Sequence, residues 1–66
     1  PNFSDTANFD DVTCIKETAS AILVEVEGRE VWIPQSQIDD ESEVWKQGDK
    51  GNLVVSQWIA ENKDLV

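Results

Sequence analysis

The clearest pattern of hydrophobic and polar positions lies at residues 21–34, AILVEVEGREVWIP. Apolar and polar residues alternate on both sides of Gly28-Arg29, and a glycine at the first position of a two-residue turn is typical of a type II′ β-hairpin. This turn would place Val24 opposite Ile33. Because side chains alternate between the two faces of a strand, one face then collects five branched aliphatic residues: Ile22, Val24, Val26, Val31 and Ile33. The other face is mixed and carries Ala21, Leu23, Glu25, Trp32 and Pro34.

The remaining apolar positions predict shorter elements. Residues 12–18 and 52–55 are rich in β-branched side chains and are typical of strands. Val44-Trp45 is expected to begin a further strand, and it is followed by residues that favour turns. Residues 35–43 predict a loop or a single helical turn, in which Ile38 is the one apolar residue.

The C-terminal pattern predicts one short helix. Ser56 is a suitable N-cap for a helix over residues 57–62. A helix of this length is unstable alone, so we expect it to dock through Trp58, Ile59 and Leu65. Short strands, frequent turns and a final helical turn predict a mainly β fold. Two forms fit: a small five-stranded barrel of the SH3-like or OB-like kind, or a curled antiparallel sheet.

The chain has 66 residues, which is near the lower limit for a domain that folds without a disulfide bond or a bound metal ion. Residues 1–11 are polar and acidic and show no hydrophobic periodicity, so they predict a flexible N-terminal arm. Residues 12–66 predict one small β domain. Cys14 is the only cysteine and histidine is absent, which excludes an internal disulfide and a zinc set. Three tryptophans are available as core anchors. A free thiol without a signal-peptide pattern predicts a cytoplasmic protein.

Fourteen acidic and five basic residues give a net charge of −9. The few bases are dispersed and form no stripe that would displace counterions from a phosphate backbone, so direct nucleic-acid binding is disfavoured. Binding to an anionic membrane is disfavoured for the same reason, and no apolar run has membrane-spanning length. The acidic excess either serves solubility or forms an acidic face for a basic partner. Mutual repulsion is expected to raise the pKa of some carboxyl groups.

No residue pattern indicates catalysis, a metal site or a cofactor. A Ser, Cys or Thr nucleophile needs an adjacent base, and Cys14 lies in an apolar strand pattern that is typical of a buried side chain. The acids of residues 10–11 and 39–41 lie in polar segments without a cleft that would hold them for acid–base work. Residues 39–43 also lack the glycine and the distal glutamate of a calcium loop. We therefore predict a protein that is not an enzyme.

Tryptophans close to acidic residues are the candidate binding residues. Aromatic side chains beside carboxylates are typical of grooves that hold proline-rich peptides, and exposed indoles can stack on the bases of a nucleic-acid single strand. The predicted binding residues are Trp32, Trp45, Glu25, Asp39, Asp40 and Glu41.

Four segments carry a resemblance to a known domain. KETASAILV (16–24), EVWIPQSQI (30–38), GDKGNLVV (48–55) and WIAE (58–61) form a pattern. This pattern resembles a short uncharacterised domain that occurs alone or within phage and bacterial proteins of replication and recombination. The resemblance covers residues 13–65 and implies a setting in nucleic-acid metabolism. It implies no activity and no binding residues.

These observations favour an interaction module that docks a protein partner, a basic one if the acidic face serves recognition, in a phage-like DNA-processing setting. Two alternatives are an accessory domain that binds single-stranded nucleic acid and an acidic DNA mimic that inhibits a basic DNA-binding protein. A further alternative is a structural unit that self-associates through an exposed strand edge. The sequence does not specify the oligomeric state.

Overall fold

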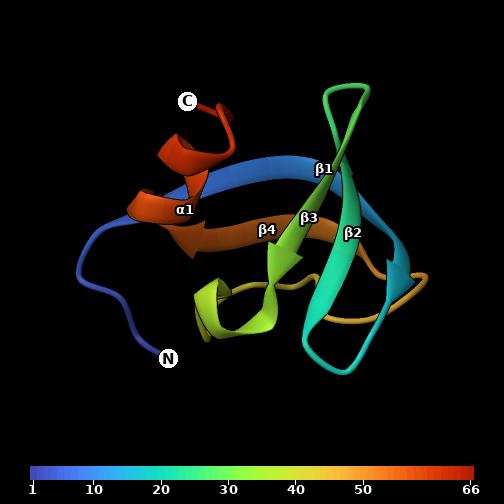
Figure 1. The fold of residues 1–66 in the computed structure, drawn as a ribbon, viewed down its shortest axis with the longest axis horizontal. Helices are drawn as coiled ribbons and strands as arrows, with labels where there is room; N and C mark the ends of the chain where they lie inside the picture. The colour runs from blue at the N-terminus through green and yellow to red at the C-terminus, as the bar shows by residue number, and fades with distance from the viewer.

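The computed structural model describes residues 1–66 and contains one antiparallel sheet with the strand order β3-β2-β1-β4. The elements are β1 (Thr6–Glu17), β2 (Ala21–Val26), β3 (Arg29–Pro34), the 3-10 helix η1 (Gln35–Gln37), β4 (Lys50–Ser56) and α1 (Gln57–Asn62). The hairpin β2–β3 crosses in front of β1 and β4 (Figure 1). The mainly β class and the C-terminal helix are confirmed, but the sheet is open and has four strands, so a five-stranded barrel is not confirmed. No helix is long and apolar enough to cross a membrane.

The turn of the hairpin differs from the prediction. Its two central residues are Glu27 and Gly28, with φ angles of 50° and 81°, and the ladder closes with Val26 opposite Arg29. Two positive φ angles are typical of a type I′ turn, whose twist matches that of the flanking strands. The predicted type II′ turn at Gly28-Arg29 is therefore wrong by one residue.

The faces of the hairpin are nevertheless as predicted. Moving the turn by one residue moves each cross-strand partner by two, and Val24 lies opposite Val31 instead of Ile33. A slip of two residues leaves every side chain on the same face, whereas a slip of one would have exchanged the faces. The five aliphatic residues of the predicted core face are all buried.

Strand β1 is longer than predicted and is shared by both halves of the sheet. Residues 6–11, predicted as part of a flexible arm, form its first half and pair with β4, while its second half pairs with β2. One extra residue is inserted between Phe9 and Val12, where Asp11 has a φ of 56°. Such a bulge bends a strand. The arm prediction is wrong because this insertion interrupts the alternation that places Ala7 and Val12 in the core.

The predicted strand at Val44-Trp45 is a loop in the structure. Val44 is fully buried and Trp45 packs against the core, so the apolar pair fills the interior without joining a ladder. Strand β4 is bordered instead by residues 38–43, which form a covering segment. Ile38, the predicted apolar residue of this region, is fully buried and forms an isolated bridge with Val55.

The covering segment forms hydrogen bonds with the backbone groups on the outer edge of β4. The Val54 C=O accepts a hydrogen bond from the Asp39 N–H at 2.9 Å, and the Val54 N–H donates to Ser42 Oγ at 3.1 Å. The Asn52 C=O accepts from the Glu43 N–H at 2.9 Å, and the Asn52 N–H donates to Glu43 Oε1 at 2.8 Å. The outward backbone groups of both residues are therefore paired.

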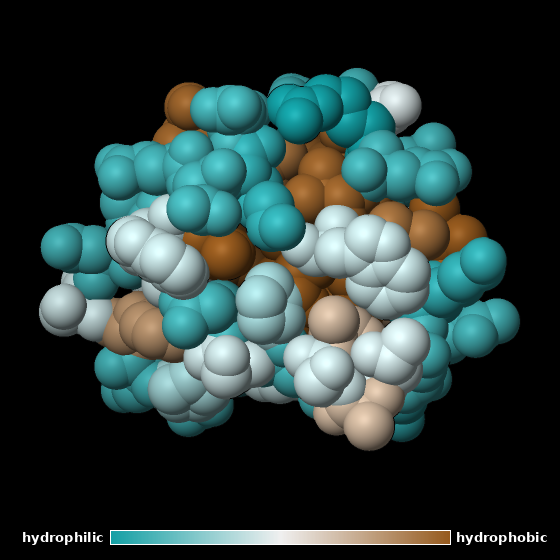
Figure 2. All heavy atoms as spheres, viewed as in Figure 1, coloured by the Kyte–Doolittle hydropathy of each residue, from teal (hydrophilic) through white to brown (hydrophobic).

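The core lies between the hairpin and the β1–β4 pair, and α1 closes one end. Ser56 caps α1 as predicted, because its Oγ accepts from the Ile59 N–H at 3.2 Å. Ile59 and Ala60 are buried and Leu65 packs against the core. Trp58 is 60% exposed, so its predicted docking is wrong; the short helix has one inner face, and Ile59 and Ala60 occupy it. Figure 2 shows hydrophobic surface between the hairpin and α1, rimmed by hydrophilic atoms.

Candidate functional site

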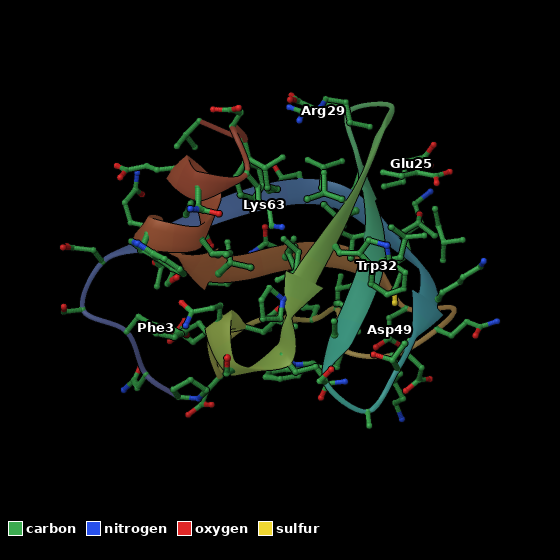
Figure 3. The ribbon with its side chains drawn as sticks, viewed as in Figure 1. Phe3, Glu25, Arg29, Trp32, Asp49 and Lys63 are labelled. Atoms are coloured by element: carbon green, nitrogen blue, oxygen red, sulfur yellow. The ribbon has the colours of Figure 1, made fainter.

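The hairpin face that points away from the core carries Trp32, which is 43% exposed. Trp32 lies opposite Leu23 on β2, and Leu23 lies opposite Lys16 on β1. Directly paired residues share a face, and the next row on this face consists of Glu30, Glu25 and Thr13. Leu23 is only 9% exposed although it lies outside the core cluster. The Trp32 indole lies in front of β2 (Figure 3), on the same face of the hairpin as Leu23.

The outer edge of β3 is unpaired. In a hairpin with a two-residue turn, the pair that flanks the turn is hydrogen-bonded, and this pair is Val26 and Arg29. Because backbone groups alternate in direction along a strand, the N–H and C=O of Glu30 and Trp32 point away from β2. Neither residue makes a backbone hydrogen bond outside the regular elements. Pro34 has no N–H and ends the strand.

Asp39 is used by the fold and is only 2% exposed. Its Oδ2 accepts from the Glu41 N–H at 3.0 Å and its Oδ1 from the Phe3 N–H at 2.8 Å. These two backbone hydrogen bonds hold the pKa of the Asp39 carboxyl below its usual range. The rise in pKa predicted for some carboxyl groups does not occur at Asp39, because hydrogen bonding outweighs the effect of desolvation. Its carboxylate fixes the N-terminal segment and is not available to a partner.

Trp45 is also held within the chain. Its Nε1–H donates to the Ser42 C=O at 2.7 Å, and its backbone N–H donates to Asp49 Oδ2 at 2.9 Å. Asp49 Oδ2 also accepts from the Lys46 N–H at 3.0 Å. The hydrogen bonds from Trp45 and Lys46 hold the pKa of the Asp49 carboxyl below its usual range. Trp45 thus anchors a loop, as a half-buried residue against the core.

The six predicted binding residues therefore divide into three groups. Trp32 and Glu25 share the exposed face of the hairpin. Asp39 and Trp45 are tied into loops by their own hydrogen bonds. Asp40 and Glu41 are exposed on the covering segment, which borders β4 and thus the opposite edge of the sheet.

The structure also contains a pocket that the sequence did not predict. It is shallow, has a volume of about 520 Å³, and lies between the N-terminal segment, η1 and the start of α1. Its lining consists of Phe3, Ser4, Asp5, Gln37, Ser56, Gln57, Trp58 and Glu61. Sequence reasoning missed it because Phe3 was assigned to an arm and Trp58 to the core. One signal was present: Trp58 and Glu61 are three residues apart, so they are neighbours on a helix surface.

Cys14 is buried in β1, and its Sγ lies 3.2 Å from the Lys16 C=O, to which it donates. Burial raises the pKa of the thiol, and the nearby charges of Glu17 and Asp49 raise it further. A thiol with a raised pKa is a weak nucleophile at neutral pH. No group of three or more His, Cys, Asp or Glu side chains is placed to hold a metal ion.

Comparisons of the chain with protein-family models, with curated proteins and with solved structures find no significant match. Function is therefore inferred from the open β3 edge, its exposed tryptophan and the pocket beside α1.

Proposed function

We propose that this protein is a non-enzymatic interaction module that binds an extended segment of a protein partner along the outer edge of β3. The observation that carries this proposal is the unpaired backbone of Glu30 and Trp32 next to an exposed indole. An extended segment joins such an edge through main-chain hydrogen bonds, and contacts with its side chains select it. Trp32 would be the anchor, because tryptophan is enriched among the residues that dominate binding energy.

The charges beside this edge favour a basic segment. Glu30 and Glu25 stand in one row of the exposed face. The guanidinium of Arg29 is turned toward the C-terminal end of the chain, where it donates to the Asp64 C=O at 2.9 Å and the Lys63 C=O at 3.3 Å. Lys16 shares this face but lies on β1, two strands from the open edge. The acids Glu30 and Glu25 lie on β3 and β2, and they disfavour an acidic segment, including a second copy of this chain.

The alternative functions have weaker support. Single-stranded nucleic acid needs positive charge along its backbone, whereas Glu25 and Glu30 stand beside Trp32. A DNA mimic would present the acids of residues 39–43 as a row, but the Asp39 carboxylate is buried. The phage-like DNA-processing setting stays a prediction that depends on the resemblance alone.

The test is a selection of binding peptides from a random-peptide display library, followed by affinity measurements with two variants. Glu30→Pro removes one outward N–H from an edge position, where proline is tolerated, and Trp32→Ala removes the anchor. We expect selected peptides to be rich in Lys and Arg and to lose at least about tenfold in affinity with each variant. Asn62→Ala is the control, since it changes an exposed side chain of α1 that lies outside the β3 edge and should leave the affinity unchanged.

The backbone part of the proposal has its own test. Binding of a selected peptide should protect the Glu30 and Trp32 amides from hydrogen exchange, and N-methylation of alternate peptide residues should abolish binding. Peptides that bind wild type, Glu30→Pro and Trp32→Ala equally well would overturn the proposal. So would quenching of Trp32 fluorescence by single-stranded DNA without any peptide binding, since that result would favour the nucleic-acid alternative.

A further inference from the structure

The pocket beside α1 has an unusual combination of lining residues. Phe3 and Trp58 supply two aromatic rings, and Asp5 and Glu61 supply two carboxylates. The other lining residues are uncharged, and no Lys or Arg is among them: Ser4, Gln37, Ser56 and Gln57. Aromatic faces and carboxylates share one preference, which is for a cation.

Hydrogen bonds fix the wall that carries Phe3 and Asp5. The Phe3 N–H donates to the buried carboxylate of Asp39 at 2.8 Å. Two residues further along, the Asp5 C=O accepts from the Gln57 N–H of α1 at 3.0 Å. Figure 3 shows Phe3 on the N-terminal segment, close to η1 and below α1. The backbone of this wall is thus fixed before a ligand arrives, which lowers the ordering cost of binding.

The two carboxylates are not neutralised within the chain. The only ion pair in the structure joins the amine of Pro1 to Asp40. Glu61 Oε2 accepts a neutral hydrogen bond from Gln57 Nε2 at 3.2 Å. The pocket therefore presents negative charge beside the indole of Trp58, which is the more exposed of the two exposed tryptophans.

We propose that this pocket binds an alkylammonium group, the side chain of a lysine or methylated lysine in a partner protein. An ammonium over the face of an indole is attracted by the quadrupole of the ring. Carboxylates add Coulomb attraction, and aromatic carbons contact the methylene or methyl groups of the ligand. An anion would be repelled, and a neutral group would gain no Coulomb attraction from Asp5 and Glu61. The site shares no residue with the β3 edge, so either proposal can fail without the other.

The test uses small probes and the amide and indole resonances of the full chain in NMR titrations. The probes are the N-acetyl amides of lysine and of trimethyllysine, with the uncharged tert-butyl isostere of trimethyllysine as control. We expect saturable shifts at Trp58, Glu61 and Phe3 with a Kd on the order of millimolar for the cations. The uncharged isostere should bind at least about fivefold more weakly. The two cations tell whether methylation strengthens or weakens the contact.

Matched variants assign the binding to the pocket. Trp58→Leu keeps an apolar side chain but removes the aromatic face, and it should weaken cation binding about fivefold. Glu61→Gln should weaken it and reduce its salt dependence. Trp32→Leu and Glu30→Gln make the same changes on the hairpin and should leave the Kd unchanged. All four positions are exposed, so the fold should survive each change.

Three results would overturn the proposal. The first is equal binding of the cations and the uncharged isostere, which would indicate an apolar site. The second is unchanged affinity in Trp58→Leu. The third is the absence of saturable shifts up to roughly tens of millimolar probe, a concentration well above the expected Kd.

Discussion

The two edges of the sheet are built in opposite ways. At β4, the covering segment pairs with the outward backbone groups of Asn52 and Val54 and adds a bridge from Ile38 to Val55. At β3, the outward groups of the strand find no partner in the chain. Proteins normally blunt both edges to prevent unwanted pairing. The difference indicates that the β4 edge belongs to the stability of the fold and that the β3 edge is available for a partner.

A proline substitution on each edge strand is the most direct test of the difference between the two edges. Val54→Pro removes an N–H that donates to Ser42 Oγ, disturbs a buried strand, and should cost about 3 kcal/mol or more of unfolding free energy. Glu30→Pro removes an outward N–H without a partner and should cost less than about 1 kcal/mol. Urea denaturation measures both values. Similar losses in the two variants would show that the edges are equivalent.

The next largest effect is expected from Ile38→Ala. Ile38 is fully buried and joins the covering segment to β4, so its truncation should cost about 2–4 kcal/mol through the cavity left behind. Trp32→Ala removes a larger side chain from the open edge and should cost less, because Trp32 lies outside the core cluster. A larger loss of unfolding free energy for Trp32→Ala than for Ile38→Ala would contradict this, because it would show that the exposed face of the hairpin contributes more to stability than the covering segment.

A smaller effect is expected from Ser42→Ala. The Ser42 hydroxyl accepts from the Val54 N–H at 3.1 Å and is buried. The hydroxyl also accepts from the Val44 N–H at 3.3 Å. Its removal leaves two buried N–H groups without this acceptor, which should cost about 1–3 kcal/mol. Ser36→Ala is the control, because Ser36 is exposed in η1. Equal melting temperatures for the two variants would contradict the role assigned to the hydroxyl.

The smallest effect concerns pH. The pKa values of Asp39 and Asp49 are lowered in the folded state by backbone hydrogen bonds. Their contribution to stability is therefore complete above the unfolded pKa of about 4 and is lost as the pH falls through the lower folded values. We expect the melting temperature of wild type to fall between pH 5 and pH 2, roughly the range over which such carboxylates titrate. Asp39→Asn should fall less steeply, and an identical slope would contradict the assignment.

The sequence predicts those features of the fold that depend on residues close together in the chain. Alternation along the two strands places the five aliphatic residues of the hairpin in the core. Ser56 caps α1 because serine is a preferred N-cap residue. Ile38 is buried because it is the one apolar residue of its segment. The turn at Glu27-Gly28 did not follow, because a glutamate with a positive φ is uncommon and glycine alone suggested another turn type.

The part that could not be predicted depends on contacts between distant residues. Nothing local distinguishes Asp39, whose carboxylate holds Phe3, from its exposed neighbour Asp40. The pocket needs Phe3 and Trp58, which are brought together only when β1 pairs with β4. Of the candidate site, the sequence therefore predicts Trp32 and Glu25 and misses the pocket.

The pairing of β1 has a consequence for the rate of folding. The hairpin β2–β3 joins neighbouring residues and can form in microseconds, whereas the β1–β4 ladder joins Thr6 to Ser56, near the two ends of the chain. We expect closure of this ladder to limit the folding rate. Until it closes, β4 also lacks its neighbours, and the folding chain is most exposed to aggregation. We expect the net charge of −9 to repel other copies at this stage and so to reduce aggregation.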